Sequence, residues 1–406
     1  MSLTTHSKGA ALRSAASLFC GLLAGTGLVQ AMLGLRALRR FKRQAGTAAP
    51  PLAGRAAPFS TEEPTWPSVS LFKPVCGEEP LLEEALESFF KLAYPGTHEL
   101  VFGLHSADDK ALPVIKALIA RHPEVEARLV IDATLHGSNR KVSNLINMAS
   151  HAQYDVWVVA DSDIHVEESY LTKVVKPLGD PGTGLVTALY TGLPASNTLV
   201  RQMGAYQINA SFLPGALMAR QMGRQDSFGA TVALHRQTLA QLGGFEALAN
   251  QVADDALLGA LTRRHGLAVA LAPTLCQTTI SETSLAALLS HELRWGRTTR
   301  KVAPVGYALS ILQYPLFWAV GAILLRPAST PAWGLLGGGW LARLVMNRFL
   351  GQETGIDLTG LDFFLPLRDC LSAGIVLASL TGRRVTWRGH TLQLTDGPFP
   401  TSGPHH

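Results

Sequence analysis

The hydrophobic pattern divides the chain into long apolar stretches near both ends and short apolar runs in the middle. From Ser14 to Leu35 there is no charged residue, and about twenty such residues suffice for one helix to cross a bilayer. Three further apolar blocks span Val305 to Leu325, Trp333 to Leu350, and Phe363 to Leu380. Between residues 68 and 280, short β-rich runs alternate with helical patterns. This alternation predicts an α/β domain with a mainly parallel sheet.

The individual elements of this middle region follow from the period of each run. A period near two or a short continuous apolar run predicts a strand, and a period of 3.6 predicts a helix. The predicted strands are Ser68 to Phe72, Leu100 to Leu104, Arg128 to Ile131, Asp155 to Ala160 and Gly184 to Tyr190. The predicted helices are Leu81 to Leu92, Leu112 to Ala120 and Asp254 to Arg264.

The first apolar stretch is flanked by unequal charge. Five cations lie within residues 36–43 on its C-terminal side, whereas only Lys8 and Arg13 lie on its N-terminal side. The positive-inside rule therefore predicts that the C-terminal flank is cytosolic. The alternative is a cleaved signal peptide, for which Val29-Gln-Ala31 is a poor cleavage site. A mature chain that began with such a basic cluster would resist export.

The C-terminal apolar blocks are less regular. Arg343 interrupts the second block, and Arg368 and Asp369 interrupt the third. Charges at such depth are costly unless they face protein, so at least one block is expected to be re-entrant or interfacial. We expect one N-terminal span, a C-terminal pair and an ambiguous fourth segment. The predicted organisation is an anchor with its basic flank (1–43), a linker (44–67), the α/β domain (68–280), an interfacial amphipathic helix (281–304), membrane segments (305–381) and a cytosolic tail (382–406).

Composition agrees with a membrane protein. Apolar residues make up 47% of the 406 residues, charged residues only 16%, and the mean hydropathy is +0.18, which excludes a disordered chain and fits an ordinary soluble enzyme poorly. Residues 1–61 contain eight Lys or Arg and no Asp or Glu, so the net charge of +5 originates there. Binding of nucleic acid would need basic residues spread over a folded face, so no nucleic-acid partner is predicted. The four cysteines are scattered, which argues against a disulfide framework or a zinc site.

Two carboxylates follow one of the buried strands. The run Asp155-Val-Trp-Val-Val-Ala ends in Asp161-Ser-Asp163, and open α/β sheets bind ligands at the carboxyl ends of their strands. Carboxylate oxygens suit Mg²⁺ or Mn²⁺, and such an ion could bridge a diphosphate. The alternative is an ordinary turn with solvated Asp side chains.

Two later segments also contain candidate chemistry. Asp254 and Asp255 begin a predicted helix, where Asp254 is expected to act as a capping charge and Asp255 could serve as a general base. The segment His291-Glu-Leu-Arg294-Trp295 precedes the C-terminal apolar blocks. Its cations could contact lipid head groups at the membrane surface, or Arg294 could neutralise phosphate oxygens in an active site.

These motifs resemble, in order, the D, D, D, (Q/R)xxRW signature of the ceramide glucosyltransferase family, glycosyltransferase family 21. The matching positions are Lys73-Pro74, Asp108-Asp109, Asp161-Ser-Asp163, Gly243-Gly244-Phe245, Asp254-Asp255 and His291-Glu-Leu-Arg294-Trp295. The resemblance covers about residues 68–302 and implies a GT-A fold and an inverting, nucleotide-sugar-dependent membrane enzyme. His291 departs from the family's Gln or Arg. The runs 139–148, 227–231 and 291–295 look closer to bacterial hopanoid-biosynthesis glycosyltransferases.

The resemblance implies a role for each site residue. Asp109 is expected near the uracil ring, and Asp161 with Asp163 at the ribose and the metal-bound diphosphate. Lys141 could reach phosphate or be a solvated surface lysine. Asp255 is expected to be the general base, with Arg294 and Trp295 closing over the diphosphate at the acceptor entrance.

The predicted reaction moves one sugar from a UDP-sugar to a lipid hydroxyl with inversion, using Mg²⁺ or Mn²⁺. The preferred substrates are UDP-N-acetylglucosamine and bacteriohopanetetrol, and the alternative is UDP-glucose with ceramide. A processive polysaccharide synthase and a non-catalytic membrane nucleotide-binding protein are rival interpretations. The expected location is the bacterial inner membrane, multi-pass, with the catalytic domain in the cytosol.

Overall fold

The computed structural model of the protein describes residues 2–47, 66–382, 384–387 and 390–393. Most of the predicted linker and most of the predicted cytosolic tail lie outside these residues. The described residues divide into two compact units. The α/β unit is built from Phe41–Ala195 and Met222–Ser281, and the helical unit from Met1–Arg40, Ser196–Gln221 and Glu282–Asp396.

The α/β unit contains an eight-stranded sheet among the described residues, with strand order β3-β2-β1-β4-β7-β6-β8-β5. Its parallel pairs are β1 with β2 and β4, β2 with β3, and β6 with β8, whereas β7 runs antiparallel to β4 and β6, and β5 to β8. The strands are β1 (Val69–Pro74), β2 (His98–Leu104), β3 (Ala127–Ile131), β4 (Val156–Ala160), β5 (Ile164–His165), β6 (Thr183–Pro194), β7 (Thr231–His235) and β8 (Ala268–Ile280). The predicted α/β fold with a mostly parallel sheet is confirmed, as are its five predicted strands.

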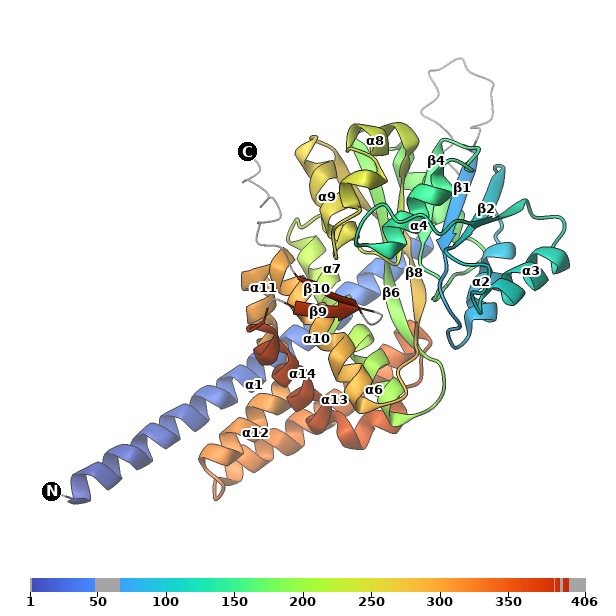
Figure 1. Ribbon diagram of the computed structural model, residues 1–406. Coiled ribbons are helices and arrows are strands. Elements are labelled where there is room, and N and C mark those ends of the chain that lie inside the picture. Colours follow the sequence, from blue (N-terminus) through green and yellow to red (C-terminus); the bar gives the residue numbers. More distant parts are fainter. Residues whose placement is uncertain (1, 48–65, 383, 388–389, 394–406) are drawn as a thin grey trace, which may run out of the picture. The chain divides into compact units, whose positions relative to one another are not determined.

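Helices cover both faces of this sheet, because apolar side chains of the central strands alternate between two cores. Leu71 of β1 belongs to the core that also contains side chains of α2 and α3, and its neighbour Phe72 belongs to the core that contains side chains of α4 and α9. Figure 1 shows α2 and α3 beside β2, and α4 on the other side of β1. The helices are α2 (Leu82–Phe90), α3 (Leu112–Arg121), α4 (Arg140–Ala149), α5 (Tyr170–Val175), α8 (Arg236–Gln241) and α9 (Asp254–Arg264), with short 3₁₀ turns at Lys176–Gly179 and Phe245–Leu248. The three predicted helices are therefore confirmed.

The helical unit contains most of α1 and the C-terminal helices. Residues 196–221, which fall within the predicted span 68–280, cluster with this unit. Its elements are α1 (Ser2–Thr47), α6 (Leu199–Gln207), a π-helical segment (Ile208–Phe212), α7 (Leu213–Gln221), α10 (Leu285–Val302), α11 (Pro304–Leu309), α12 (Pro315–Leu325), α13 (Thr330–Thr354), α14 (Leu365–Ser379), 3₁₀ turns at Ser310–Gln313 and Thr359–Phe364, and a hairpin of β9 (Arg384–Trp387) and β10 (His390–Gln393).

One helix in the described part of the chain is long and apolar enough to cross a membrane by itself, and it spans Lys8–Gly46 within α1. Pro304–Gln313 and Pro315–Leu325 meet the same criterion only as a pair, with a bend of 67° between them. The predicted C-terminal pair of spanning helices is not found in these residues. Helix α14 has only 15 residues, and α13 is polar in its second half, with Arg343, Asn347 and Arg348.

The charges that interrupt the C-terminal apolar blocks face protein, as expected from their cost in lipid. Arg343 of α13 and Asp369 of α14 are both buried, with their closest N and O atoms 2.9 Å apart. The neighbouring Arg368 is fully buried and lies 2.5 Å from Glu292 of α10. Removing one member of a buried ion pair is costly because it leaves the other charge uncompensated. These pairs therefore tie α10 and α13 to α14.

We predict that Arg343→Met lowers the free energy of unfolding by about 3–5 kcal/mol, because Asp369 would remain buried without its cation. Arg348 is the matched control on the same helix, since its pair with Asp362 is half-exposed and Arg348→Met should cost less than about 1 kcal/mol. Thermal unfolding of the purified full chain measures both. Equal losses in the two variants would contradict a special role for the buried pair, and Arg343→Met/Asp369→Leu should recover most of the loss.

Candidate active site

The candidate site of the α/β unit lies where β1 and β4 end. Asp161, Ser162 and Asp163 follow β4 directly, and backbone hydrogen bonds hold this turn to two other strands. The Asp161 amide donates to the carbonyl of Ala230 just before β7 (3.4 Å), and the Thr279 amide in β8 donates to the carbonyl of Asp163 (3.1 Å). The two carboxylates are thus presented on a turn that the sheet positions, and not on a free loop.

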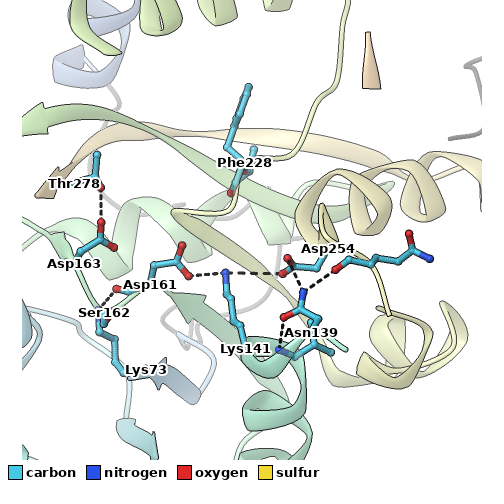
Figure 2. A network of polar contacts seen from close by, with 12 residues as sticks. Lys73, Asn139, Lys141, Asp161, Ser162, Asp163, Phe228, Asp254 and Thr278 are labelled. Atoms are coloured by element: carbon cyan, nitrogen blue, oxygen red, sulfur yellow. Dashed lines mark hydrogen bonds and ion pairs between the residues drawn. The ribbon is translucent and has the colours of Figure 1, made fainter. Parts of the chain in front are cut away.

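Lys141 joins this turn to a helix distant in the sequence. Its ammonium nitrogen lies 2.5 Å from Oδ1 of Asp161 and 3.8 Å from Oδ2 of Asp254, as Figure 2 shows. The Lys141 side chain is only 18% exposed, so the alternative of a solvated surface lysine is wrong. Burial opposes its charge, but the carboxylates of Asp161 and Asp254 outweigh burial and raise the pKa of Lys141. The cation therefore stays charged in a cluster of carboxylates.

Asn139 completes the connection between α4 and α9. Its side-chain oxygen accepts from the amide of Val142 and so caps the start of α4 (3.1 Å). Its amide nitrogen donates to the carbonyl of Gln251 (2.7 Å) and to Oδ1 of Asp254 (3.3 Å). Asp254 is the first residue of α9, where its charge favours the helix start as expected, and its carboxylate also binds Asn139 and Lys141. These contacts bring the N-termini of α4 and α9 together.

Asp255 follows Asp254 in the first turn of α9 and is half-buried. Burial, and then the neighbouring charge of Asp254, raise the pKa of Asp255 to about 6, while Lys141 opposes the rise. A Cβ atom on Gly229 would lie 3.2 Å from Oδ2 of Asp255, so the backbone of the loop before β7 passes close to this carboxylate. Asp255 is therefore a carboxylate that can exchange a proton near neutral pH.

Lys73 lies beneath the Asp161 turn at the end of β1 and is completely buried. Its ammonium donates to the backbone carbonyl of Asp161 (2.5 Å) and lies 3.7 Å from the centre of the Phe89 ring. Burial lowers the pKa of Lys73 to about 7, although the carboxylates of Asp163 and Asp161 oppose this shift. The Lys73 side chain therefore fixes the backbone of the Asp161 turn to the end of β1.

Asp163 is the second carboxylate of the turn. Its Oδ2 accepts from the hydroxyl of Thr278 in β8 (2.5 Å). Burial, and then the like charge of Asp161, raise the pKa of Asp163. Two such carboxylates in one turn fit a divalent cation, because a positive ion would relieve their repulsion. No cluster of three or more His, Cys, Asp or Glu suited to a metal occurs in the described part of the chain, so the other ligands would have to come from a bound molecule or water.

Asp109 hydrogen-bonds to backbone amides and not to the residues of the Asp161–Asp163 turn. Its carboxylate accepts from the amide of Gly77 (2.9 and 3.1 Å) in the loop after β1 and from the amide of Ala111 (2.9 Å) just before α3. The side chain therefore fixes two backbone segments to each other. Its predicted place near a uracil ring remains a prediction.

Arg294 and Trp295 lie on α10 in the helical unit. The ring of Trp295 packs edge to face against the ring of His291, with centroids 4.4 Å apart. Nδ1 of His291 contacts Oε1 of Glu282, which lowers the pKa of that carboxyl although burial opposes it. His291, at the position where the family pattern has Gln or Arg, thus links Glu282 to the tryptophan ring.

Several residues of the site in the α/β unit had no role assigned from the sequence. Lys73 belongs to a motif of the family resemblance, and its role could have been inferred, because a lysine in a buried strand otherwise made mostly of Val, Ser, Leu and Phe needs a partner. Asn139 could have been found as a helix N-cap. Nothing in the sequence pattern marks Thr278, and the run 227–231 gives no sign that Gly229 lies against a carboxylate, because both residues reach the carboxylates only through the tertiary fold.

The sequence profile of glycosyl transferase family 21 matches residues 22–399 of this chain. Ceramide glucosyltransferase 1 of Caenorhabditis elegans is 38% identical over 102 residues, which are 25% of this chain and 22% of that protein. Ceramide glucosyltransferase 3 of the same organism is 26% identical over 241 residues, covering 58% of this chain and 51% of that protein. The chain thus spans about half or less of the length of these curated relatives.

Among solved structures, the mannosyltransferase PcManGT from Pyrobaculum calidifontis, in complex with GDP-Man and Mn²⁺, is similar with a TM-score of 0.49. It is 20% identical in sequence, and the alignment covers 88% of this chain and 97% of that chain.

We predict that Lys141→Gln lowers the free energy of unfolding by about 1–3 kcal/mol, because Asp161 and Asp254 would lose their shared charged partner. The exposed Lys110, for which no ion pair occurs within the described residues, provides the control, and Lys110→Gln should change stability by less than about 0.5 kcal/mol. Urea unfolding at pH 7 compares the two variants. If Lys141→Gln were as stable as the wild type, the lysine would not be holding the two segments together.

Proposed function

Because this chain belongs to glycosyl transferase family 21, we propose that it is a membrane-bound enzyme of GT-A fold that moves one sugar from a UDP-sugar to a lipid hydroxyl. The prediction of a glycosyltransferase is thereby supported at the level of the family. The observation on which the proposal rests is the bridge formed by Lys141. It joins Asp161, the expected donor-binding carboxylate, to Asp254, the neighbour of the expected base Asp255.

The proposed donor site lies at the carboxyl ends of β1 and β4. A UDP-sugar would place its diphosphate near Lys141, whose ammonium already binds carboxylate oxygens and would also attract phosphate oxygens. Asp161 and Asp163 would hold a divalent cation, Mg²⁺ or Mn²⁺. When bound, such an ion would neutralise negative charge on the diphosphate. Asp109 and its loop would lie at the nucleoside end, as the family resemblance implies.

The proposed base is Asp255. Its carboxylate accepts the proton of the lipid hydroxyl while that oxygen attacks the anomeric carbon from the face opposite UDP, so the configuration inverts. Negative charge develops on the departing UDP, and the cation of Lys141 stabilises it. Arg294 and Trp295 are proposed to act with these residues at the acceptor entrance. A pKa of about 6 suits a base that must be ionised at neutral pH yet remain able to take a proton.

The proposed acceptor is a membrane lipid, and ceramide is better supported than bacteriohopanetetrol. The relatives described above are ceramide glucosyltransferases, which favours glucose transfer from UDP-glucose to ceramide. Transfer of N-acetylglucosamine to bacteriohopanetetrol, and the location in a bacterial inner membrane, remain predictions. The apolar helix Lys8–Gly46 supports attachment to a membrane, with its basic flank and the α/β unit on the cytosolic side.

We predict that Asp255→Asn lowers kcat by at least about 10²–10⁴-fold while UDP binding is retained, because the amide cannot accept the proton. The matched control is the exposed Asp180, and Asp180→Asn should leave kcat unchanged. Calorimetric titration with UDP and product formation with ceramide measure the two properties separately. Normal turnover in Asp255→Asn would exclude its role as base.

The same residue sets the expected pH dependence. Asp255 is active only when ionised, so kcat/KM should fall tenfold per pH unit below about 6 and level off above it. A profile that is flat from pH 5 to pH 8 would contradict a base with this pKa.

The substrates are tested by supplying UDP-glucose and UDP-N-acetylglucosamine, each with ceramide or bacteriohopanetetrol, to the purified full chain, and identifying products by mass. We expect hexosylated ceramide from UDP-glucose. Transfer only to bacteriohopanetetrol would replace ceramide as the acceptor, and a soluble polymer would favour the processive synthase instead.

A further inference from the structure

A groove separates α1 from α13 in the helical unit. The two helices run parallel, because Gly21 lies next to Leu335 and, further along both helices, Arg39 lies 2.8 Å from Glu353. The cavity between them has a volume of about 480 Å³, within the range of about 300–1,000 Å³ that is usual for small-molecule sites.

The walls of this groove are single faces of two helices. Helix α1 contributes Met32, Leu35, Arg36 and Arg39, which recur at helical spacing. Helix α13 contributes an almost entirely apolar stripe from Gly338 to Phe349. Several of these apolar side chains remain exposed to the surroundings, among them Met32 (49%) and Leu341 (62%). The acyl chain of a lipid could pack against this surface.

The charge of the groove is concentrated at one end. Arg39 binds Glu353 and lies over the ring of Phe349, 4.7 Å from its centre. Arg36 is exposed, and no carboxylate lies within ion-pair distance of it in the part of the chain that the structure describes. The groove therefore offers an apolar channel that ends at a guanidinium group without an acidic partner there. This complements a molecule with a long apolar chain and an anionic head.

The position of the groove along α1 agrees with this chemistry. The uncharged stretch that begins at Ser14 ends at Leu35, and the basic cluster begins at Arg36. If α1 crosses a bilayer, Arg36 and Arg39 lie at the level of the cytosolic lipid head groups, and Met32 lies at the level of the acyl chains.

We infer that this groove binds one anionic phospholipid, with its phosphate at Arg36 and one acyl chain between α1 and α13. The lipid is a bound structural ligand distinct from the sugar acceptor. It fills the gap between two helices that otherwise leave apolar surface exposed, and it fixes α1 to α13 in the membrane. The inference relies on the groove and the membrane attachment of α1, and not on the proposed catalytic residues.

Two glycines on α13 allow a matched test. A Cβ atom at Gly337 or at Gly338 would meet nothing within 4 Å, so neither backbone position excludes a side chain. Only Gly338 lines the groove. The full chain, purified in detergent, is mixed with dioleoylphosphatidylglycerol or dioleoylphosphatidylcholine, and the retained lipid is counted by native mass spectrometry. We expect the wild type and Gly337→Leu to retain one phosphatidylglycerol molecule, and Gly338→Leu to lose it.

The arginines are tested in the same assay. Arg36→Gln should weaken phosphatidylglycerol retention about fivefold, the effect of one cation near a phosphate. Arg40→Gln removes the same charge from an exposed residue outside the groove and should have no effect. Equal retention of both lipids by the wild type, equal losses in the two arginine variants, or full retention by Gly338→Leu would each overturn the inference. Displacement of phosphatidylglycerol by ceramide would also overturn it, because the groove would then hold the acceptor.

Discussion

The pairing of half-buried carboxylates with lysines is the constraint on which the rest of the α/β unit depends. Asp161 and Asp163 come from one segment and Asp254 and Asp255 from another, far apart in the chain. Burial together with repulsion from neighbouring carboxylates raises the pKa of Asp163, Asp254 and Asp255. Lys141 offsets this cost by contacting one carboxylate of each segment. Several negative charges, which the lysine compensates only in part, therefore lie at the end of the sheet. Such a site gains from binding a cation or from taking up a proton, which are the two properties that the proposed sugar transfer needs.

The helical unit also contains buried charges, but each of them has an oppositely charged partner. Its buried charges are matched in ion pairs, Arg343 with Asp369 and Arg368 with Glu292, and they join helices that would be poor membrane spans individually. Apolar helices alone can slide along one another, whereas a buried pair is satisfied in only one register. This explains how α13 and α14 can contain charged residues in their apolar sequence. These buried ion pairs differ from the exposed cations of α1. If α1 lies in a membrane, its cations can contact lipid head groups.

Family membership and local geometry support different parts of the functional proposal. The match to the family profile shows that the chain belongs to glycosyl transferase family 21, and the similarity to ceramide glucosyltransferases supports the proposed lipid acceptor. The family resemblance also implies that Asp255 takes the acceptor proton. The position of Asp255 at the start of α9, beside the charge of Asp254 and against the backbone of Gly229, supports this proposed role. Lys141 would then have two functions, since it holds the two segments together in the free protein and could bind phosphate when the donor is present.

The sequence by itself determined the local elements. The alternation of apolar residues specified β1, β2, β3, β4 and β6, and the 3.6-residue period specified α2, α3 and α9, because the two faces of a strand or helix are encoded by neighbouring residues. It also identified the Asp161–Asp163 turn and the apolar N-terminal helix. Only the tertiary structure decided that β7 lies antiparallel between β4 and β6, that Asp109 fixes two loops, that Lys141 is buried against Asp254, and that the charges of α13 and α14 neutralise one another. Each of these depends on which distant segments meet, and periodicity within a single segment contains no information about that.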